Sequence, residues 1–573
     1  MAKRWIILPA EPTIEPLANQ WNVEPIIAQL LFNRSQRAYQ SVSHFLDPQL
    51  KNMDDPGVLP GVPEASALIA DAIHAKSRIV LYGDYDVDGI TGVAILWHVL
   101  SLGGAEVSFY VPHRVDEGYG LNPGAVRQII EDGAKMVITV DCGVSSAAEV
   151  DLFRNAGVKV VVSDHHNLQG PLPNADAVVH PSLADQPGAD LCGAGVAFKL
   201  GWGVAQVLSG GNRVNDAFRQ LLVELLPLAA LGTIADVVPL IGENRIIAKH
   251  GLARLGRTSL VGLRALIESS GLSGGAIDGQ DVGFKLAPRI NAAGRMGHAR
   301  LAVELLTRAD SDRAREIALY LEDHNRSRQA TERRILKQAI ECVEGRNLAG
   351  DARRAIVVAS EGWHAGVIGI VAARLVDRYH RPVVVIALSG DQGQGSCRSI
   401  SSFKITDGLR TCGAHLISFG GHDMAAGLKI APDSVAAFTD ALVETANNLL
   451  TPADLIPCLR LDAEVLLNDL NLATGEAMAR LGPFGAGNPK PKFATDWIEL
   501  ADEPRTVGRG ESHLQASFRQ NGKRMKAIGF GMAHVIETLK EQRRCQVAFT
   551  PIINDFNGRR TVEMQMLDIR FPD

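Results

Sequence analysis

Short apolar runs rich in β-branched residues alternate with helical patterns through the first half of the chain. The runs expected to form strands are residues 79–82, 107–111, 136–140, 159–162 and 177–179. This alternation predicts βα units around a mostly parallel sheet. Ligands of such sheets bind outside the carboxyl ends of the strands, so the residues that follow each run are the first candidates for function.

A long polar stretch separates this region from the rest of the chain. Residues 311–344 are rich in Arg, Glu, Gln and Leu and contain neither Pro nor Gly. Asp310 or Ser311 can cap the start of a helix there, and Gly345 can end it. One helix of this length would extend ~50 Å and would bridge two domains rather than fill a core. A break near His324-Asn325 stays open as an alternative.

The second half contains two further modules. Residues 355–358 and 381–387 predict strands of a second α/β module that ends near Leu450. Beyond Thr451-Pro452, apolar runs at 526–530 and 545–553 alternate with hairpin signals at Asn521-Gly522 and Asn557-Gly558. We therefore expect a mainly β module, folded as a small barrel.

Length and composition agree with several domains. A chain of 573 residues exceeds one hydrophobic core, and a prior of ~150 residues per domain gives roughly two to four. The formal net charge of -6 argues against coating nucleic acid by bulk charge but leaves room for a local basic groove. The 7 cysteines form no C-x-x-C pair and are expected to be reduced thiols. With no apolar stretch near ~18 residues and no signal-peptide core, we expect a cytoplasmic protein with no membrane partner.

Four acidic or histidine-containing segments carry the candidate chemistry. Three follow predicted strands, and the fourth ends the apolar stretch 221–231, which we interpret as a helix. They are Gly83-Asp84-Tyr85-Asp86-Val87-Asp88-Gly89, Asp141-Cys142-Gly143, Ser163-Asp164-His165-His166 and Gly232-Thr233-Ile234-Ala235-Asp236. Carboxylate oxygens mixed with imidazole suit Mn²⁺ or Mg²⁺, and an Asp shared between two ions is typical of two-metal phosphoesterases. The segments predict a metal-dependent hydrolase of phosphate esters.

The first segment resembles the start of a calcium-binding EF-hand loop. That interpretation fails because Ile95 stands where a bidentate Glu is required and because a strand, not a helix, precedes the loop. In an extended loop, alternate spacing would send Asp84, Asp86 and Asp88 to one side, where cations would have to offset their repulsion. The alternative is a solvated acidic turn that caps a helix at Thr91.

Each of the other segments also has a structural explanation. Asp141 is as well explained by a helix cap as by a ligand role, and Asp236 by a loop cap. The pair His165-His166 is more specific, because one imidazole can bind metal while its neighbour contacts phosphate, although paired histidines often lie on the surface. The occurrence of all four segments in this order is harder to dismiss than any one of them.

In this order the segments identify a family. Together with Val111-Pro112-His113-Arg114 and residues 117–121, 191–196, 287–295, 361–369 and 420–427, they give a sequence that resembles the DHH phosphoesterase superfamily over almost the whole chain. Residues 420–427 are similar to the glycine-rich substrate motif of the DHHA1 domain. The resemblance implies an α/β fold with a DHH domain of mostly parallel sheet, a long linking helix, a second α/β DHHA1 domain and a C-terminal mainly β domain of OB type.

These modules define the expected boundaries. We expect an N-terminal segment packed on the catalytic domain (1–60), a DHH catalytic domain (61–305), a long interdomain helix (306–345), a DHHA1 domain (346–450) and an OB-like nucleic-acid-binding domain (455–573). The resemblance also implies 5′ to 3′ exonuclease activity on single-stranded DNA, with release of 5′-mononucleotides, in DNA repair and recombination. It further implies a monomer, with single-strand-binding protein and a RecQ-type helicase as partners.

For the metal centre the hypothesis is two divalent cations, Mn²⁺ or Mg²⁺, separated by ~3.5 to 4 Å and bridged by Asp141. Asp88, His165 and Asp236 would complete the protein ligands of one ion, and Asp86 with Asp84 those of the other. His166 is the candidate for contact with the scissile phosphate, and Asp164 supports the histidine pair.

Glycines and arginines are the candidates for substrate contacts. Backbone amides of Gly420 and Gly421 can approach a phosphate closely, and His422 adds a donor, although a turn between strands explains these glycines equally well. Arginines suit forked contacts to phosphate, including a 5′-terminal one, but each is singly more often a surface residue. The candidates are Arg114, Arg289, Arg295, Ser396 and Arg398.

The β module contains a basic cluster near two aromatic residues, Phe518 and Phe530. An OB barrel binds single strands with such a basic track and aromatic platforms, although a solvated charged face is the default and Phe530 could belong to the core. The cluster consists of Arg505, Arg509, Arg519, Lys523, Arg524 and Lys526.

Two other functions stay open beside the exonuclease. One is a DHH-type phosphodiesterase of short oligonucleotides or cyclic dinucleotides, or a pyrophosphatase, whose chains generally lack the long helix and the C-terminal barrel. The other is a non-catalytic DNA-binding replication factor. The intact set of Asp86, Asp88, Asp141, His165 and Asp236 argues against the latter.

Overall fold

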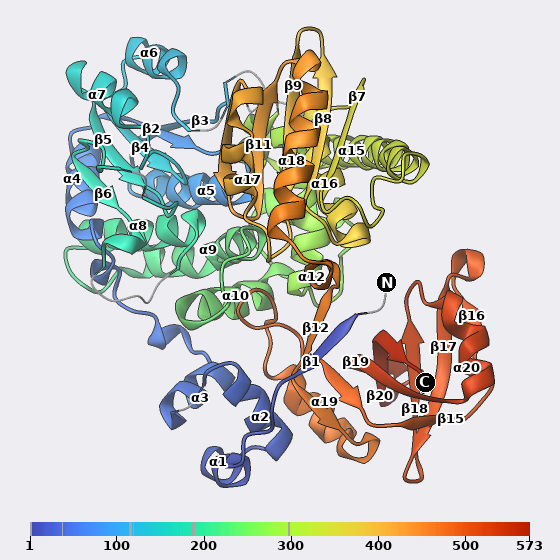
Figure 1. Ribbon diagram of the computed structural model, residues 1–573. Coiled ribbons are helices and arrows are strands. Elements are labelled where there is room, and N and C mark those ends of the chain that lie inside the picture. Colours follow the sequence, from blue (N-terminus) through green and yellow to red (C-terminus); the bar gives the residue numbers. More distant parts are fainter. Residues whose placement is uncertain are drawn as a thin grey trace. The chain divides into compact units, whose positions relative to one another are not determined.

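The structure is a computed structural model (Figure 1) that describes residues 3–36, 38–113, 117–118, 120–168, 170–184, 190–295 and 298–572; the side chains of Tyr39 and Arg295 are not among the described parts. The chain forms two compact units. The larger contains Trp5–Asn291, Ala299–Ala318 and Leu459–Asp573, and the smaller contains Ala292–His298 and Leu319–Cys458.

A five-stranded sheet of the larger unit holds the expected strands. It consists of β2 (Arg78–Gly83), β3 (Glu106–Tyr110), β4 (Met136–Val140), β5 (Lys159–Ser163) and β6 (Ala177–Val179). All its pairs are parallel and the order is β3-β2-β4-β5-β6, which confirms the predicted parallel sheet. The chain leaves β2 toward β3 on one side and returns to β4 on the other. Between β2 and β4 the order therefore reverses, and this is where α/β sheets bind ligands.

Helices cover both faces of this sheet (Figure 1). Those between the strands are α5 (Val87–Leu102), α6 (Pro123–Glu131) and α7 (Ala147–Asn155), and α4 (Val62–His74) precedes β2. Residues of α6 and α7 share one core with Val80, Tyr82 and Val160 of the strands. On the other side, α5 packs against α8 (Gly193–Leu208) and α9 (Asp216–Ala235).

Helix α9 confirms the helix expected before Asp236. Among the described residues it is the one helix that is long and apolar enough, by length and composition, to cross a membrane, but 61% of its apolar window is buried inside the protein. It therefore has the surroundings of a core helix. The helices that follow are α10 (Gly242–Leu255), α11 (Val261–Ser269), α12 (Gly279–Asp281), the π-helix η4 (Val282–Leu286), α13 (Ala287–Arg295) and α14 (Ala299–Thr307).

The long polar stretch forms one helix, α15 (Ser311–Gly345), of 35 residues. At 1.5 Å per residue it is about 52 Å long. It continues through His324 and Asn325, so the alternative of a break there is wrong. Its first turns belong to the larger unit and the rest to the smaller one, as expected for a bridging helix.

The smaller unit contains the second sheet, with the order β10-β11-β9-β8-β7. Its strands are β7 (Ile356–Glu361), β8 (Val383–Ser389), β9 (Gln392–Arg398), β10 (Ser418–His422) and β11 (Ala425–Ile430). Only β7 and β8 pair in parallel. The helices of this module are α16 (Ala365–Tyr379), α17 (Ile405–Thr411) and α18 (Val435–Leu449).

The C-terminal module is a closed barrel of β15 (Ile498–Leu500), β17 (His513–Gln520), β18 (Lys523–Gly529), β19 (Arg544–Phe556) and β20 (Arg559–Arg570). The strands pair around a ring in which β19 contacts both β15 and β20, and β18 runs parallel to β20. This is the five-stranded topology of an OB fold. Two-residue turns with positive φ at both positions, Asn521-Gly522 (48° and 80°) and Asn557-Gly558 (51° and 74°), confirm the predicted hairpins.

Smaller elements precede the barrel in sequence or lie between its strands. They are β1 (Arg4–Ile7), β12 (Cys458–Leu461), β13 (Ala463–Val465), α19 (Leu472–Ala479), β14 (Phe493–Thr495), β16 (Arg505–Val507) and α20 (Ile536–Gln542).

The N-terminal segment does not pack as expected. Its helices α1 (Ile14–Trp21), α2 (Pro25–Asn33) and α3 (Tyr39–Leu46) bury side chains in one core with Phe493, Phe518 and Phe549 of the barrel. The prediction that residues 1–60 pack on the catalytic domain is therefore wrong for α1 and α2, whose apolar faces complete the barrel core. Helix α3 contributes to the same core but also contacts the catalytic domain, because Arg245 of α10 lies over the ring of Phe45 and donates to Phe45 O at 2.8 Å. The link that follows α3 does contact the catalytic domain: Lys199 Nζ lies 2.6 Å from Asp54 O.

Candidate metal centre and nucleic-acid groove

Three of the acidic segments meet at the carboxyl edge of the parallel sheet, where each extends the hydrogen-bond ladder by one residue. The amide of Asp84 donates to Val140 O (3.2 Å), and the amide of Asp141 donates to Ser163 O (3.0 Å). Asp164 N donates to the last residue of β6 at 3.2 Å. Asp84, Asp141 and Asp164 therefore occupy equivalent positions at the ends of β2, β4 and β5, on both sides of the point where the strand order reverses.

The first segment turns into a helix sooner than expected. Asp86 is the N-cap of α5, and its carboxylate accepts hydrogen bonds from the amides of Asp88 (2.9 Å) and Gly89 (3.2 Å). Asp88 already lies in the first turn of α5. The expectation that an extended loop sends Asp84, Asp86 and Asp88 to a common side is therefore wrong, and the three carboxylates divide between two groups.

Asp88 is held by the start of another helix. Its carboxylate accepts hydrogen bonds from Gly193 N (2.5 Å) and Ala194 N (2.9 Å), the first two amides of α8. A helix N-terminus presents unpaired amides and a positive dipole end, and both stabilise a carboxylate. The sequence motif at residues 191–196 thus positions Asp88 through its backbone, a role that its residue types did not reveal.

Among the residues that the structure describes, three overlapping groups of side chains could hold divalent cations. They are Asp84, Asp86 and Asp141; Asp88, His165 and Asp236; and Asp141, His165 and His166, with the ligand atoms in each group within 4.8 Å of one another. His165 Nε2 lies 3.1 Å from Asp141 Oδ1, 3.6 Å from Asp88 Oδ2 and 3.7 Å from Asp236 Oδ2. The predicted ligands therefore come together, with Asp141 and His165 shared between groups.

Asp164 does not point into these groups but holds the histidine pair. Its Oδ1 accepts hydrogen bonds from His165 N (2.7 Å), His166 N (3.1 Å) and His166 Nδ1 (2.7 Å), and its Oδ2 accepts one from Val144 N (3.0 Å). Burial opposes ionisation of Asp164, but these hydrogen bonds and the nearby His166 lower its pKa below the ordinary value. The same carboxylate raises the pKa of His166, although burial alone would lower it. The hydrogen bond to Nδ1 therefore fixes the orientation of the His166 ring.

The electrostatics of the cluster fit bound cations. Burial, followed by repulsion from Asp88, Asp86 and Asp84, raises the pKa of Asp141 well above the ordinary value. Burial and the same kind of repulsion raise the pKa of Asp236 to about 8. Burial lowers the pKa of His165, which keeps its imidazole neutral and able to bind metal. The buried Nε2 of His165 makes no hydrogen bond within the described residues. The cluster thus brings together carboxylate oxygens and an imidazole nitrogen, which are donors that Mn²⁺ and Mg²⁺ accept.

Small residues and strained backbone conformations allow the candidate metal ligands to lie close together. A Cβ on Gly232 would lie 2.5 Å from Asp88 Oδ1, and one on Gly193 would lie 2.7 Å from Asp141 Oδ1, so neither position has room for a side chain. Asp141 (φ 64°) and Val237 (φ 62°), the latter directly after Asp236, adopt left-handed backbone conformations. Strain of this kind is retained where the surrounding structure fixes a functional geometry.

The glycine-rich motif of the second sheet lies within a strand. Gly420, Gly421 and His422 belong to the exposed edge strand β10, and the turn that follows consists of Asp423 and Met424, so the alternative that places these glycines in the turn is wrong. Across β11, the register aligns Gly420 with Ser396 and His422 with Arg398. Directly opposed residues share a face, so the predicted donors of this module form two adjacent rows.

The remaining arginines of the predicted substrate set are less informative. Arg114 lies outside the described residues, and so does the side chain of Arg295. Arg289 is half-buried on α13, and its guanidinium donates to Lys285 O at 2.5 Å. Its role in substrate binding stays a prediction.

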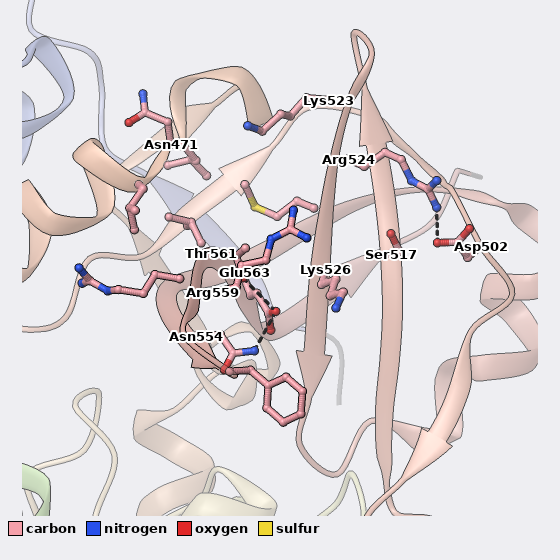
Figure 2. A pocket seen from close by; sticks show the side chains of 16 residues that line it. Asn471, Asp502, Ser517, Lys523, Arg524, Lys526, Asn554, Arg559, Thr561 and Glu563 are labelled. Atoms are coloured by element: carbon pink, nitrogen blue, oxygen red, sulfur yellow. Dashed lines mark hydrogen bonds and ion pairs between the residues drawn. The ribbon is translucent and has the colours of Figure 1, made fainter. Parts of the chain in front are cut away.

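In the barrel, a groove of about 580 Å³ gathers part of the predicted basic cluster (Figure 2). Lys523, Arg524 and Lys526 line it, as do Arg559 and Arg560 from the start of β20. Two of these cations are neutralised: Arg524 pairs with Asp502, and Arg560 with Glu476 at 2.6 Å. Arg559 and Arg560 were missed by sequence reasoning, because they follow the Asn557-Gly558 turn, some 35 residues from Lys523 and Arg524.

The aromatic residues of the groove differ from those expected. Phe518 is fully buried in the barrel core, so it cannot serve as a platform. Phe530 is 58% exposed and packs edge-on against His513, so the alternative that assigns it to the core is wrong. The aromatic side chain that does line the groove is Phe556, which is 70% exposed.

The other predicted cations of the barrel lie outside this groove. Arg519 pairs with Glu499 at 2.8 Å in a separate depression that also contains Arg543 and Arg544. Arg505 donates to Gln515 Oε1 at 2.7 Å, and Arg509 occupies a short 3₁₀ turn. The structure therefore divides the predicted cluster instead of presenting one continuous track.

Comparison with known proteins shows to which family the chain belongs. Residues 78–233 match the DHH family, N-terminal domain, residues 353–448 match the DHHA1 domain, and residues 461–568 match the RecJ OB domain. Over 573 residues, the chain is 38% identical to the single-stranded-DNA-specific exonuclease RecJ of Bacillus subtilis, covering 99% of this chain and 70% of that one. The corresponding protein of Haemophilus influenzae is 34% identical, with 96% of each chain covered. The chain belongs to the RecJ family.

Solved structures of the RecJ family agree with this assignment. The crystal structure of RecJ in complex with Mn²⁺ from Thermus thermophilus superposes with a TM-score of 0.84 at 32% identity, covering 100% of this chain and 80% of that one. The complex with Mg²⁺ from the same organism gives a TM-score of 0.78 at 31% identity, covering 100% and 79%. The predicted DHH resemblance and the fold of DHH, DHHA1 and OB domains are thereby confirmed.

Proposed function

We propose that this chain is a metal-dependent exonuclease that degrades single-stranded DNA from the 5′ end and releases 5′-mononucleotides, in DNA repair and recombination. The observation that carries the proposal is the convergence of Asp88, Asp141 and His165 at the switch point of the parallel sheet. That convergence occurs in a chain that aligns along its length with enzymes named single-stranded-DNA-specific exonucleases.

The distances support a division of the ligands between two Mn²⁺ or Mg²⁺ ions. Asp88, His165 and Asp236 would hold one ion, Asp84 and Asp86 the other, and Asp141 would contact both. When bound, the ions activate water and neutralise the negative charge that develops on the phosphoryl oxygens.

The two adjacent histidines have different proposed roles. Asp164 fixes the ring of His166 through Nδ1, so Nε2 can donate to a non-bridging oxygen of the scissile phosphate. The same carboxylate receives the two backbone amides of the pair and thereby sets the angle at which His165 enters the cluster. Hydrolysis would break the P–O3′ bond, so that the released nucleotide keeps its 5′-phosphate.

The strand is proposed to contact basic and glycine-rich surfaces on the other modules. In the DHHA1 module the donors would be Ser396, Arg398, Gly420, Gly421 and His422, with Arg114, Arg289 and Arg295 contributing from the DHH side. In the barrel the contacts would be made in the groove that contains Lys523 and Arg524. A groove built for a polyanion favours a polymer over the short oligonucleotides or cyclic dinucleotides of the alternative function.

One assay separates these functions. Single-stranded DNA labelled at either end is incubated with Mn²⁺ and compared with duplex DNA, dinucleotides and pyrophosphate. Early release of labelled mononucleotide from the 5′-labelled strand alone supports the proposal, whereas preference for dinucleotides supports the phosphodiesterase. Asp141→Ala should abolish turnover without loss of the folded state, and robust Mn²⁺-dependent activity in that variant contradicts the bridging role.

Cytoplasmic location, a monomeric state and recruitment by single-strand-binding protein and a RecQ-type helicase are proposed on family grounds alone. Sedimentation of the purified chain, with and without each partner, tests the last two.

A further inference from the structure

One residue at a strand end beside the metal centre has no part in the function described so far. His180 follows Val179, the last residue of the edge strand β6 (Figure 1), and the register of the sheet pairs Val179 with Ser163. The next residue after Ser163, Asp164, donates its amide to Val179 O at 3.2 Å. His180 therefore continues on β6 the row of residues that follow the ends of β2, β4 and β5.

The side chain of His180 is fully buried, and each of its ring nitrogens has a backbone partner. Ser182 N donates to Nδ1 at 3.1 Å, and Nε2 lies 2.8 Å from His166 O. Because an amide N–H can only donate and a carbonyl oxygen can only accept, the two contacts together fix the tautomer. The neutral ring accepts at Nδ1 and donates from Nε2, and the second hydrogen bond ties the end of β6 to the backbone of the histidine pair.

The backbone of His166 is thus held on both sides. Its amide and its ring Nδ1 donate to Asp164 Oδ1 at 3.1 and 2.7 Å, and its carbonyl accepts from His180. Asp164 fixes the peptide group before His166, and His180 fixes the one after it. Peptide groups are planar, so two fixed peptide groups set the direction in which the side chain between them leaves the backbone.

Part of this arrangement has a purely structural explanation. His180 is the N-cap of the short helix η3 (Pro181–Leu183), and the contact between Nδ1 and Ser182 N belongs to that cap. The Nε2 contact does not serve the cap, because it reaches His166, 14 residues earlier in the chain. The two nitrogens therefore have separable roles, and a substitution can remove one contact and keep the other.

We propose that His180 is a positioning residue for His166 and thereby for the contact of His166 with the scissile phosphate. The proposal rests on the proposed exonuclease function and deepens it by giving a role to a buried residue that acts through another side chain. Displacement of a catalytic group by about 1 Å can lower the rate by about 100-fold. Because His166 is proposed to act on the reacting phosphate, loss of its support should appear in kcat and not in KM.

The test compares two substitutions of His180 in the full chain. The amide nitrogen of Gln reaches about as far from Cα as Nε2 of His, whereas the amide of Asn reaches only about as far as Nδ1. His180→Gln therefore keeps a donor for His166 O and loses the cap, and His180→Asn keeps the cap and loses the donor. On single-stranded DNA with saturating Mn²⁺, His180→Asn should lower kcat by roughly 10- to 100-fold at unchanged KM, and His180→Gln should keep kcat within about three-fold.

A second readout needs no metal. In EDTA, amide hydrogen exchange of the peptide that contains His165 and His166 should be faster in His180→Asn than in the native protein, because exchange reports local opening. In His180→Gln the exchange of this peptide should stay at the native rate. His74→Asn is the control: His74 is an exposed histidine in the last turn of α4, and its replacement should change neither kcat nor exchange.

The positioning role is refuted if folded His180→Asn keeps the native kcat, or if the loss falls on His180→Gln instead, as a capping role alone requires. If a thermal melt shows that His180→Asn does not fold, His180→Gln decides: a loss of about ten-fold or more in its kcat overturns the proposal, and near-native kcat supports it. Failure of the native protein to degrade single-stranded DNA in Mn²⁺ would instead refute the proposed function, so the two failures are distinguishable.

Discussion

The cations of the barrel groove lead to a quantitative prediction about salt. Among the described residues, Lys523, Lys526 and Arg559 line the groove without an ion-pair partner. A cation that neutralises one phosphate of a single strand contributes about 0.7 to the slope of log K against log salt, so replacement of all three by alanine should flatten that slope by about 2. At about 0.1 M salt this corresponds to a loss of affinity of roughly a hundred-fold, which should disappear as the salt approaches about 1 M.

The two remaining groove cations should contribute less. Arg524 pairs with Asp502, and Arg560 with Glu476, so each must give up a protein carboxylate before it can neutralise a phosphate. The double replacement of Lys523 and Arg524 should therefore flatten the slope by about 0.7 to 1.4, depending on whether Arg524 leaves its partner.

Fluorescence anisotropy of a labelled oligothymidine in EDTA, repeated across a series of salt concentrations, gives these slopes directly. Lys540→Ala is the matched control, because Lys540 lies in the same domain on α20 and pairs with Glu537 at 2.8 Å. A triple variant that keeps the native slope, while the control also keeps it, would show that the strand does not run through this groove.

Three other perturbations test the metal centre. Gly232→Ala brings a Cβ to 2.5 Å from Asp88 Oδ1 and should weaken Mn²⁺ binding by roughly 10- to 100-fold in a metal titration; Gly211→Ala, where a Cβ meets nothing within 4 Å, should leave it unchanged. Asp164→Asn should lower kcat by a similar factor, because it releases the histidine ring that the carboxylate holds, and an unchanged kcat would contradict the positioning role. In EDTA, thermal melts should show stability falling as pH rises, because burial and neighbouring carboxylates raise the pKa of Asp236 in the folded protein to about 8. The stability that the protonated Asp236 contributes is full below the ordinary carboxyl pKa and is lost as the pH rises through about 8. Added Mn²⁺ should reverse this loss at high pH, and a melting temperature that rises with pH in EDTA would contradict it.

Much of the fold follows from local patterns. The central strand β4 of the parallel sheet is short and buried along its whole length, and the Asn-Gly turns at 521–522 and 557–558 require the positive φ values that they adopt. The four acidic segments were predictable as a group because parallel strands bring their carboxyl ends to one edge. The position of Asp88 was not predictable, because the N-cap at Asp86 starts a helix where an extended loop was expected.

The rest depends on contacts between distant segments. The amides of Gly193 and Ala194 hold a carboxylate 105 and 106 residues away, and no local pattern marks that contact. The phase of β17 did carry a usable signal: Leu514, Ala516 and Phe518 alternate with polar residues, so Phe518 belongs on the inner face of the barrel. The packing of the N-terminal helices was predicted wrongly for the same reason that the hydrogen bonds to Asp88 were not predicted. In both cases the partners lie far away in the sequence.

The core shared by the N-terminal helices and the barrel has a consequence for synthesis. Leu30, Leu31 and Phe45 emerge from the ribosome early, whereas the barrel residues that cover them, from Val465 onward, are made about 420 residues later. At the usual ~5 to 20 residues per second, these apolar surfaces wait roughly 20 to 80 s for their partner. The N-terminal helices thus keep apolar surface uncovered through most of the synthesis of the barrel, and their shared core can close only after the barrel strands have left the ribosome.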